Sequence, residues 1–473
     1  MNYADSARIK SVLENLGFEY TKDIDSADII IFDTCSVRQK SEDKIFGKLK
    51  QISPDKKVWL TGCMVQHDLL GLSKIDSQLI KAYKRGNFAP VAKDMYPLIV
   101  WINPQQEKED FWSNPRDVVY INASFQPLWD KLKAKFSNVE LLFRIDDLPY
   151  LPLMLQKLWY NVTYSPEVVD EYTSLLPGDS NQLLDVRLPV AYIPIQTGCS
   201  QFCAYCIVPF SRWLEKNRAV EDVVREAKHY LDQWYKEIML LGQIVNKHPD
   251  FVKIIREILK LQGLKWLRYT SPYPTFYSEE LLKLHEQEQK LVPHIHAPVQ
   301  SWSTKVLKKM FRWYSAEQYR EFVDKIRALK RDISITTDII VGFTDETEED
   351  FLQTLELTKY ARFDMIYIGI YSVRPGTIAA RKYQDNVPEE EKKRRWQVLN
   401  DLLQNISFQN NQKEVGKIYD VLVKTVWDSN AVGYNEQMKT IIFPLAQNSI
   451  KVGDFVKVRI TKPDALKLWG EIV

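Results

Sequence analysis

The stretch AYIPIQTGCSQFCAYC, residues 191–206, places three cysteines directly after a short apolar run. The run Ala191–Ile195 has the composition of a β-strand, and Cys199, Cys203 and Cys206 follow it with the spacing C-x3-C-x2-C. Three thiolates on one loop can hold three irons of a cubane iron–sulfur cluster and leave the fourth iron open for a ligand. The alternatives are a zinc site and thiols without a ligand role. Zinc prefers four ligands, and no fourth cysteine or histidine lies near in the sequence.

Around this loop, the chain from about Leu188 onward alternates between strand-like and helix-like segments. Helical periodicity is clear over Val220–Gln233 and Glu348–Tyr360. The expected strands cover 191–195, 236–241, 265–270, 294–299, 333–341 and 363–371. Six alternating β and α units predict a parallel, barrel-like α/β domain whose chemistry lies at the C-terminal ends of the strands.

Polar residues follow several of these strands at the predicted catalytic edge. Gln243 and Asn246 come after the second strand, and His296 and Gln300 belong to the end of the fourth. Each is a candidate to bind a ligand or substrate, and each could equally be a satisfied polar residue at a strand end.

The N-terminal part predicts a second α/β domain. Helical spacing over Ser6–Leu16 stops at Gly17, and the apolar runs at 27–35 and 57–63 are typical of strands buried on both faces of a parallel sheet. Cys35 and Cys63 each end one of these strands, so both project from one sheet edge, where a second metal centre could be bound. Two ligands are too few for a cubane, and two buried structural thiols are the alternative.

Two other parts of the chain differ from this α/β pattern. Residues 70–185 carry no clear motif, and we interpret them as the rest of the first domain plus an insertion. Residues 413–473 contain short alternating strands at 418–423, 440–444 and 455–460, joined by Gly, Asn and Asp turns. This pattern predicts a small all-β barrel.

Composition favours a cytosolic globular protein. No apolar run approaches the roughly 18 residues of a membrane helix, and the opening MNYADSARIK is unlike a signal peptide. The thiols should therefore stay reduced. The 64 basic and 62 acidic residues leave a net charge of only +2, so any nucleic-acid binding must come from local patches.

At this point the motifs resemble, in order, the methylthiotransferase branch of the radical S-adenosylmethionine (SAM) enzymes. The match covers nearly all of the chain outside 70–185. The segments that carry it are 1–19, 33–44, 61–66, 197–218, 240–246, 270–274, 296–301, 336–343, 371–377, 416–423 and 433–443. DTCSVRQKSEDK (33–44) is closest to the branch that modifies isopentenyl-adenosine in the tRNA anticodon loop. Sister branches act on threonylcarbamoyl-adenosine in tRNA or on a ribosomal protein, and a non-catalytic tRNA-binding relative is a further alternative.

The resemblance implies a fold of three domains. They are an α/β methylthiotransferase domain of Rossmann-like type over 1–185, a partial (βα)6 radical SAM barrel over 186–412, and a small C-terminal β-barrel of the TRAM type over 413–473.

It also implies the chemistry. A 4Fe-4S cluster on Cys199, Cys203 and Cys206 would cleave SAM reductively, and a second, auxiliary 4Fe-4S cluster at Cys35 and Cys63 would deliver sulfur. Further cofactor contacts are expected at Tyr205, Arg212, Asp338 and Gly342. The expected partners are the tRNA anticodon loop and an electron donor such as flavodoxin or ferredoxin. We expect a cytoplasmic monomer with no membrane contact.

The chain departs from the family pattern in two ways. The family has a third N-terminal cysteine just before the Met-Asn that opens this chain, so we expect the chain to start late and to lack one auxiliary ligand. Trp213, Trp234, Trp302 and Trp313 stand where the family has glycine, and Trp234 also follows a predicted helix, where φ is often positive. We hypothesise that a codon read as glycine in the source bacterium was translated as tryptophan.

Overall fold

The computed structural model describes residues 2–21, 23–34, 39–62, 65, 134–143, 145, 148, 151–158, 160–162, 190–212, 215–427, 429–445 and 450–473. Cys35, Cys63 and Trp213 lie outside these residues, as does most of 70–185. The chain forms two compact units. The first comprises Met1–Gly178, Cys206–Leu214 and Arg374–Thr377, and the second comprises Asp179–Tyr205, Glu215–Val373 and Ile378–Val473. The boundaries of the three domains expected from the sequence stay predictions.

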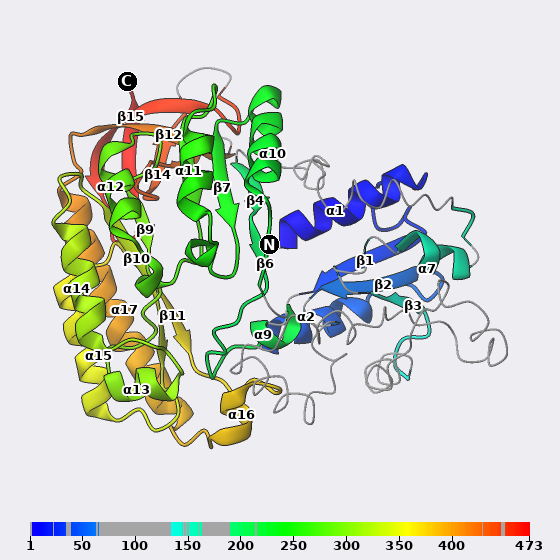
Figure 1. Cartoon of the computed structure of the whole chain (residues 1–473), viewed down its shortest axis with the longest axis horizontal. Helices are drawn as coiled ribbons and strands as arrows, with labels where there is room; N and C mark the ends of the chain where they lie inside the picture. Colours follow the sequence, from blue (N-terminus) through cyan, green and yellow to red (C-terminus); the bar gives the residue numbers. More distant parts are fainter. Residues whose placement is uncertain are drawn as a thin grey trace. The chain divides into compact units, whose positions relative to one another are not determined.

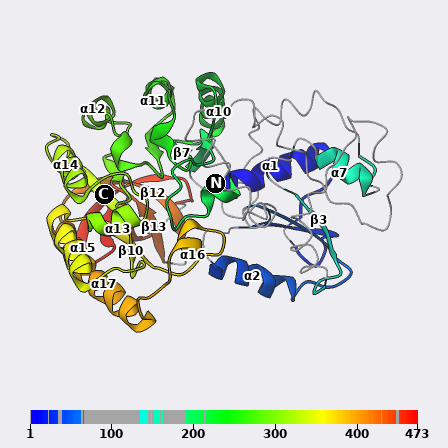
Figure 2. The same cartoon turned by 60° about the horizontal axis from the view of Figure 1, so that its bottom comes forward.

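The first unit is built on a parallel sheet with helices on both faces. Its strands are β1 (Ile29–Thr34), β2 (Lys57–Gly62) and β3 (Val139–Leu142), in the order β1-β2-β3. Helices α1 (Asn2–Asn15) and α2 (Gln39–Leu49) lie on opposite faces, as Figures 1 and 2 show. The short helices α7 (Leu151–Lys157) and α9 (Val208–Ser211) also belong to this unit.

Successive side chains of β2 point to opposite faces of the sheet, and apolar ones on both faces explain why a helix covers each face. Trp59 packs with Val12 of α1, whereas Leu60 packs with Leu49 of α2. The two predicted strands are confirmed, but burial of the first on both faces is wrong: β1 is half-buried up to Thr34, and it lies at the edge of the sheet that the described residues form. Strand β3 was not predicted.

The second unit contains the six predicted parallel strands. They are β4 (Val190–Pro194), β7 (Glu237–Leu241), β8 (Trp266–Tyr269), β9 (His294–His296), β10 (Ser334–Val341) and β11 (Met365–Ile370). They form the sheets β4-β7-β8 and β11-β10-β9. The alternating helices α10 (Val220–Gln233), α11 (Phe251–Leu259), α12 (Glu279–Gln287), α14 (Ala316–Arg327) and α15 (Glu348–Ala361) lie on their outer side (Figure 2). The (βα)6 prediction is therefore confirmed.

Local sequence signals account for these helices. In α10, buried residues recur at Val220, Val223, Ala227 and Tyr230, which is the spacing of one helix face. Helix α15 begins at a capping box in which the Thr347 hydroxyl accepts from the Asp350 N–H and Asp350 accepts from the Thr347 N–H. Trp234 follows α10 with φ 170°, which is extended backbone, so the expectation of a positive φ there is wrong.

Shorter elements connect the strands of the barrel. Strand β5 (Gln196–Thr197) pairs antiparallel with β6 (Lys216–Asn217). The remaining short elements are the 3-10 turns η2 (Val245–Lys247) and η3 (Pro274–Phe276) and the helices α13 (Thr304–Lys309) and α16 (Ile378–Lys382). No described helix has the length and apolar character needed to cross a membrane.

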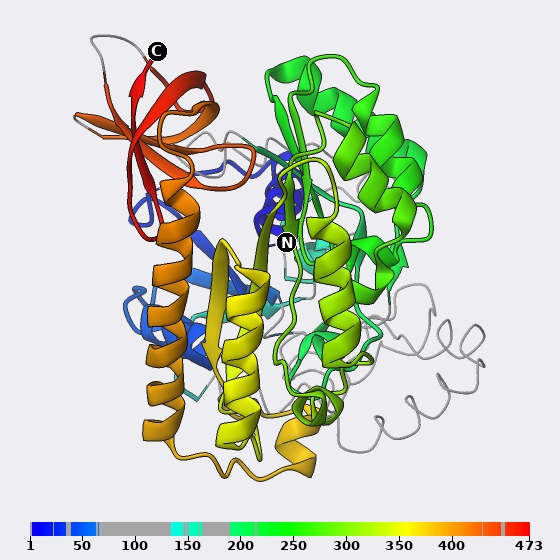
Figure 3. The same cartoon turned by 90° about the vertical axis from the view of Figure 1, so that its left-hand side faces the viewer.

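The C-terminal part is the predicted small β-barrel. Helix α17 (Glu389–Gln412) leads into it, and Figure 3 shows the barrel beside the C-terminal end of that helix. Its strands are β12 (Ile418–Val426), β13 (Asn430–Tyr434), β14 (Thr440–Pro444), β15 (Phe455–Pro463) and β16 (Leu468–Ile472), closed in the order β12-β13-β14-β16-β15. Closure leaves the barrel without a free sheet edge.

Candidate functional site

The cysteine loop begins directly after β5 and is anchored at its middle. Gly198 at φ 82° and Phe202 at φ 51° turn the chain, and Cys199 and Cys203 are buried. The Ala204 N–H donates to the Met310 carbonyl at 2.8 Å, and the Ala204 carbonyl accepts from the Ala379 N–H at 2.7 Å. These bonds hold the loop at the C-terminal edge of the strands, as the sequence predicts.

All three predicted cluster cysteines lie within the described residues. Cys199 and Cys203 are buried, and Cys206 is half-buried. Cys206 begins the segment whose contacts place it in the first unit. The described residues hold no group of three His, Cys, Asp or Glu side chains that could hold a single metal ion. The donor set is nevertheless of the kind that holds an iron–sulfur cluster: three cysteine thiols on one loop, with a cationic side chain beside one of them.

That cation is Arg312, which the sequence analysis missed. Its Nη1 lies 3.7 Å from Cys203 Sγ, and its Nη2 donates to the Pro298 carbonyl at 2.6 Å. Burial lowers the pKa of Arg312, but the neighbouring Tyr314, Tyr205, Cys203 and Tyr273 raise it, and the net pKa lies well above its usual value. The guanidinium therefore remains charged. The only sequence signal was an arginine set among aromatic residues in FRWY, 311–314.

Two polar residues after β7 have different roles. Asn246 is fully engaged by backbone: its Nδ2 donates to the Tyr273 carbonyl at 2.9 Å, and its Oδ1 accepts from the Tyr273 N–H at 2.8 Å. Gln243 instead has a buried Oε1 for which the described residues offer no hydrogen-bond partner. A buried acceptor without a donor is costly unless a ligand supplies one. The geometry thus favours Gln243 over Asn246 as a ligand contact.

His296 and Asp338 form a connected pair on β9 and β10. His296 Nδ1 lies 2.9 Å from Thr336 Oγ1, and its Nε2 lies 3.2 Å from Asp338 Oδ2. The Asp338 side chain is 38% exposed, so its other oxygen can reach a ligand. Gln300 lies beside them with φ 73°, and its N–H donates to the Asp338 carbonyl at 2.8 Å.

Gly342 and Tyr205 have clear packing roles. Gly342 has φ 71°, and a Cβ there would lie 2.3 Å from Lys392 Cγ, so only glycine fits. The Tyr205 ring meets Phe343 edge to face, with centroids 6.5 Å apart. Neither contact tests a role in cofactor binding.

In the first unit, Arg212 forms a buried ion pair with α1. Its Nη2 lies 2.6 Å from Asp5 Oδ2, and both side chains are buried. Arg212 therefore ties the segment that begins with Cys206 to the N-terminal helix. A direct cofactor contact of Arg212 stays a prediction.

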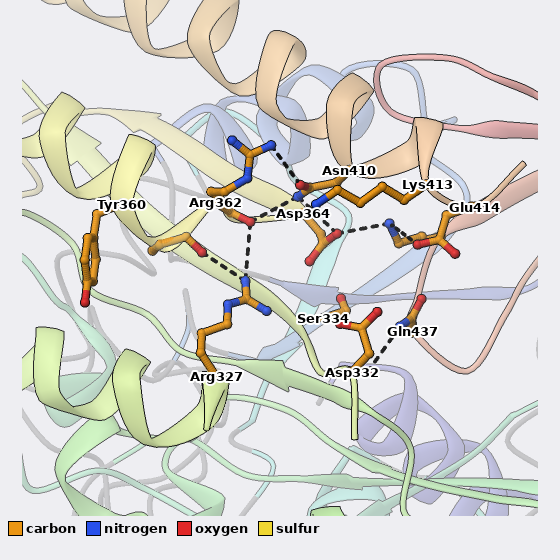
Figure 4. Close-up of a pocket in the computed structure, with 12 residues that line it drawn as sticks. Arg327, Asp332, Ser334, Tyr360, Arg362, Asp364, Asn410, Lys413, Glu414 and Gln437 are labelled. Atoms are coloured by element: carbon orange, nitrogen blue, oxygen red, sulfur yellow. Dashed lines mark hydrogen bonds and ion pairs between the residues drawn. The ribbon is translucent and has the colours of Figure 1, made fainter. Parts of the chain in front are cut away.

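A cavity of about 330 Å³ lies at the opposite edge of the second unit, where β10 and β11 begin (Figure 4). Lys439 lines it and lies 3.1 Å from Asp364 and 3.4 Å from Glu414. None of the site residues expected from the sequence lines this cavity.

Comparisons with known proteins agree with the order of these elements. Residues 1–80 match the model of Uncharacterized protein family UPF0004, residues 193–358 that of the Radical SAM superfamily, and residues 412–473 that of the TRAM domain.

Curated relatives match over the whole chain. The tRNA-2-methylthio-N(6)-dimethylallyladenosine synthase of Thermoanaerobacter sp. (strain X514) is 31% identical, and the match covers 100% of this chain and 90% of that protein. The enzyme of the same name from Carboxydothermus hydrogenoformans is 33% identical over 100% of this chain and 97% of that protein. Among solved structures, a radical S-adenosylmethionine methyltransferase from Kitasatospora setae matches 80% of this chain and 71% of its own, with 13% identity and a TM-score of 0.47.

Proposed function

The chain belongs to the tRNA-2-methylthio-N(6)-dimethylallyladenosine synthase family, and from this premise we propose that Cys199, Cys203 and Cys206 are the ligands of its radical SAM cluster. It is a radical SAM methylthiotransferase that acts on isopentenyl-adenosine in tRNA, and its family uses an iron–sulfur cluster and SAM. The single observation that carries the ligand proposal is the spacing of the three cysteines on the loop after β5. A cluster bound there supplies one electron for reductive cleavage of SAM.

The protein's own residues orient and shield the cofactor. We assign Gln243 to accept a hydrogen bond from it, because Oε1 is buried and no described residue donates to it. Asp338 offers a second acceptor, which His296 holds in place through Oδ2. Asn246 acts indirectly by fixing the backbone of Tyr273.

Iron analysis and SAM cleavage test these assignments together. In anaerobically reconstituted protein, Cys203→Ala should abolish production of 5′-deoxyadenosine and lower the iron content by about four per chain. Gln243→Ala should weaken SAM binding about tenfold, which corresponds to the loss of one hydrogen bond to a buried acceptor. Glu279→Gln, at an exposed position on α12, is the matched control and should change neither. A Cys203→Ala protein that still cleaves SAM contradicts the ligand assignment.

A second cluster is proposed at Cys35 and Cys63. Support comes from the residues just before them, because Thr34 and Gly62 end the parallel strands β1 and β2 and are paired in register. The cysteines that follow should leave the same sheet edge. Two thiols are too few for a cubane, so the test uses protein that also carries the family's further N-terminal cysteine. Iron content should fall there in Cys35→Ala/Cys63→Ala, and an unchanged value contradicts the proposal.

Binding of tRNA is implied by the family and by the TRAM match. We further propose that the anticodon loop is the bound part, that a flavodoxin or ferredoxin supplies electrons, and that the enzyme acts as a cytoplasmic monomer. Nucleoside analysis of tRNA from a deletion strain tests the substrate: loss of the methylthio group from isopentenyl-adenosine is expected. Light scattering should give a mass near 55.5 kDa.

A further inference from the structure

Arg312 is a buried cation without an anionic partner among the residues that the structure describes. It is 6% exposed, and no described carboxylate forms an ion pair with it. Its hydrogen bonds to oxygen all go to neutral groups: the Pro298 carbonyl at 2.6 Å from Nη2, and the Tyr314 hydroxyl at 3.0 Å from Nε and 2.9 Å from Nη2. A buried charge without a counter-charge is strongly unfavourable. Another group must therefore compensate the positive charge of Arg312.

Two aromatic rings supply only part of that balance. The guanidinium carbon lies 4.2 Å from the centroid of the Tyr273 ring and 5.1 Å from that of Tyr314. Such contacts favour a cation, but their quadrupoles are weaker than a full negative charge. A neutral hydrogen-bond donor could bind the Pro298 carbonyl, the Tyr314 hydroxyl and the aromatic rings equally well. These contacts therefore do not explain why the residue at position 312 carries a permanent charge.

The remaining partner is Cys203. Nη1 points at its sulfur from 3.7 Å, so a thiolate there would be the missing anion. Once thiolates hold an iron–sulfur cluster, the negative charge is spread over the cluster and grows by one unit when the cluster is reduced. A fixed cation at this distance stabilises the reduced form more than the oxidised form.

We propose that Arg312 is a positioning residue that raises the reduction potential of the radical SAM cluster through its charge and its hydrogen bond to the Cys203 sulfur. This inference rests on the proposed ligand role of the cysteines. The reduction adds one electron from a low-potential one-electron donor, no proton moves, and the guanidinium stays charged throughout. Removing the charge should make the cluster harder to reduce while leaving its iron in place.

A redox titration followed by electron paramagnetic resonance tests the proposal. The protein carries Cys35→Ala/Cys63→Ala so that only the radical SAM cluster contributes a signal. Arg312→Gln keeps a donor for the Pro298 carbonyl but removes the charge, Arg312→Lys keeps the charge, and Tyr314→Phe removes a hydrogen-bond partner while the charge remains. Arg312→Met, which fills similar space, repeats the test if Arg312→Gln does not fold.

Arg312→Gln should lower the ratio of reduced to oxidised cluster at least about tenfold at a fixed potential, equivalent to a shift of about 59 mV to more negative values for a one-electron couple. Arg312→Lys and Tyr314→Phe should stay close to the parent protein, and all variants should keep about four irons. An unchanged midpoint in Arg312→Gln, or an equal shift in Arg312→Lys, overturns the proposal. A parent protein that assembles no cluster instead refutes the ligand assignment itself.

Discussion

Replacing Arg268 with methionine should loosen the C-terminal barrel from strands β7 and β8, which lie in the same unit. Arg268 Nε lies 2.6 Å from Glu237 Oε1, and both side chains are almost completely buried. The other two guanidinium nitrogens donate to the Glu436 and Asn435 carbonyls, each at 2.8 Å, in the turn between β13 and β14. The Tyr434 hydroxyl donates to the second Glu237 oxygen at 3.1 Å. One arginine therefore connects β7, β8 and the C-terminal barrel.

The loss of stability in Arg268→Met follows from the polar groups that lose their partner. Arg268→Met leaves a buried carboxylate without its cation, which costs about 3–5 kcal/mol. The buried Asn435 carbonyl and the part-buried Glu436 carbonyl also lose their donors, at about 1 kcal/mol each. Burial raises the pKa of Glu237 and Arg268 counteracts it, so the variant's carboxyl should take up a proton more readily. The cost should therefore be smaller at pH 6 than at pH 8.

Hydrogen exchange followed by mass spectrometry measures this locally. Amides in 430–444 should exchange at least about a hundredfold faster in Arg268→Met, because 3 kcal/mol corresponds to that factor. Lys265→Met is the matched control at the same junction: Lys265 pairs with Asp420 at 3.1 Å, and both side chains are about one third exposed. Its effect should stay below about 1 kcal/mol.

A double variant separates charge from packing. Glu237→Gln/Arg268→Met removes the charge pair together and should recover a large part of the loss. Equal exchange in Arg268→Met and Lys265→Met would show that the buried pair contributes no more than a surface pair, and would refute the reasoning.

Three further outcomes can be checked separately. Gly342→Ala should lower the free energy of unfolding by at least about 2 kcal/mol, because the positive φ and a clash with Lys392 both oppose a Cβ. Gly263→Ala, at φ +82° with no atom closer than 3.9 Å, should lower it by only about 1 kcal/mol. Urea titration measures both values. Burial lowers the pKa of His285 to about 3, so the folded state holds the neutral imidazole. The free energy of unfolding should therefore fall as the pH drops below about 6.5, by roughly 2 kcal/mol at pH 5. His285→Gln should lose this pH dependence, and an unchanged dependence in the variant would contradict the assignment to His285. Peptide mass spectrometry should find glycine at position 313, where the indole would be 69% exposed, and an indole there would end the recoding hypothesis.

Much of the fold was predictable because its signals are local. The strands after Leu188 are short apolar runs between segments of helical period, and the structure confirms their order with ends within a few residues. Strand β3 was missed because Val139–Leu142 is only four residues long and lies in a part of the chain without motifs. The half-buried state of β1 was missed because a sequence does not show which strand lies at a sheet edge.

The functional site also combines features that the sequence predicts with features that only the folded chain shows. The sequence alone determined the three-cysteine loop, the polar residues at the strand ends and the small barrel, because spacing and periodicity are properties of neighbouring residues. Only the tertiary structure decided that Asn246 is already engaged, that the Oε1 of Gln243 has no partner among the described residues, and that Arg312 lies against a sulfur 109 residues away in the chain. A buried charge finds its partner through folding, and no local pattern records which distant side chain that partner is.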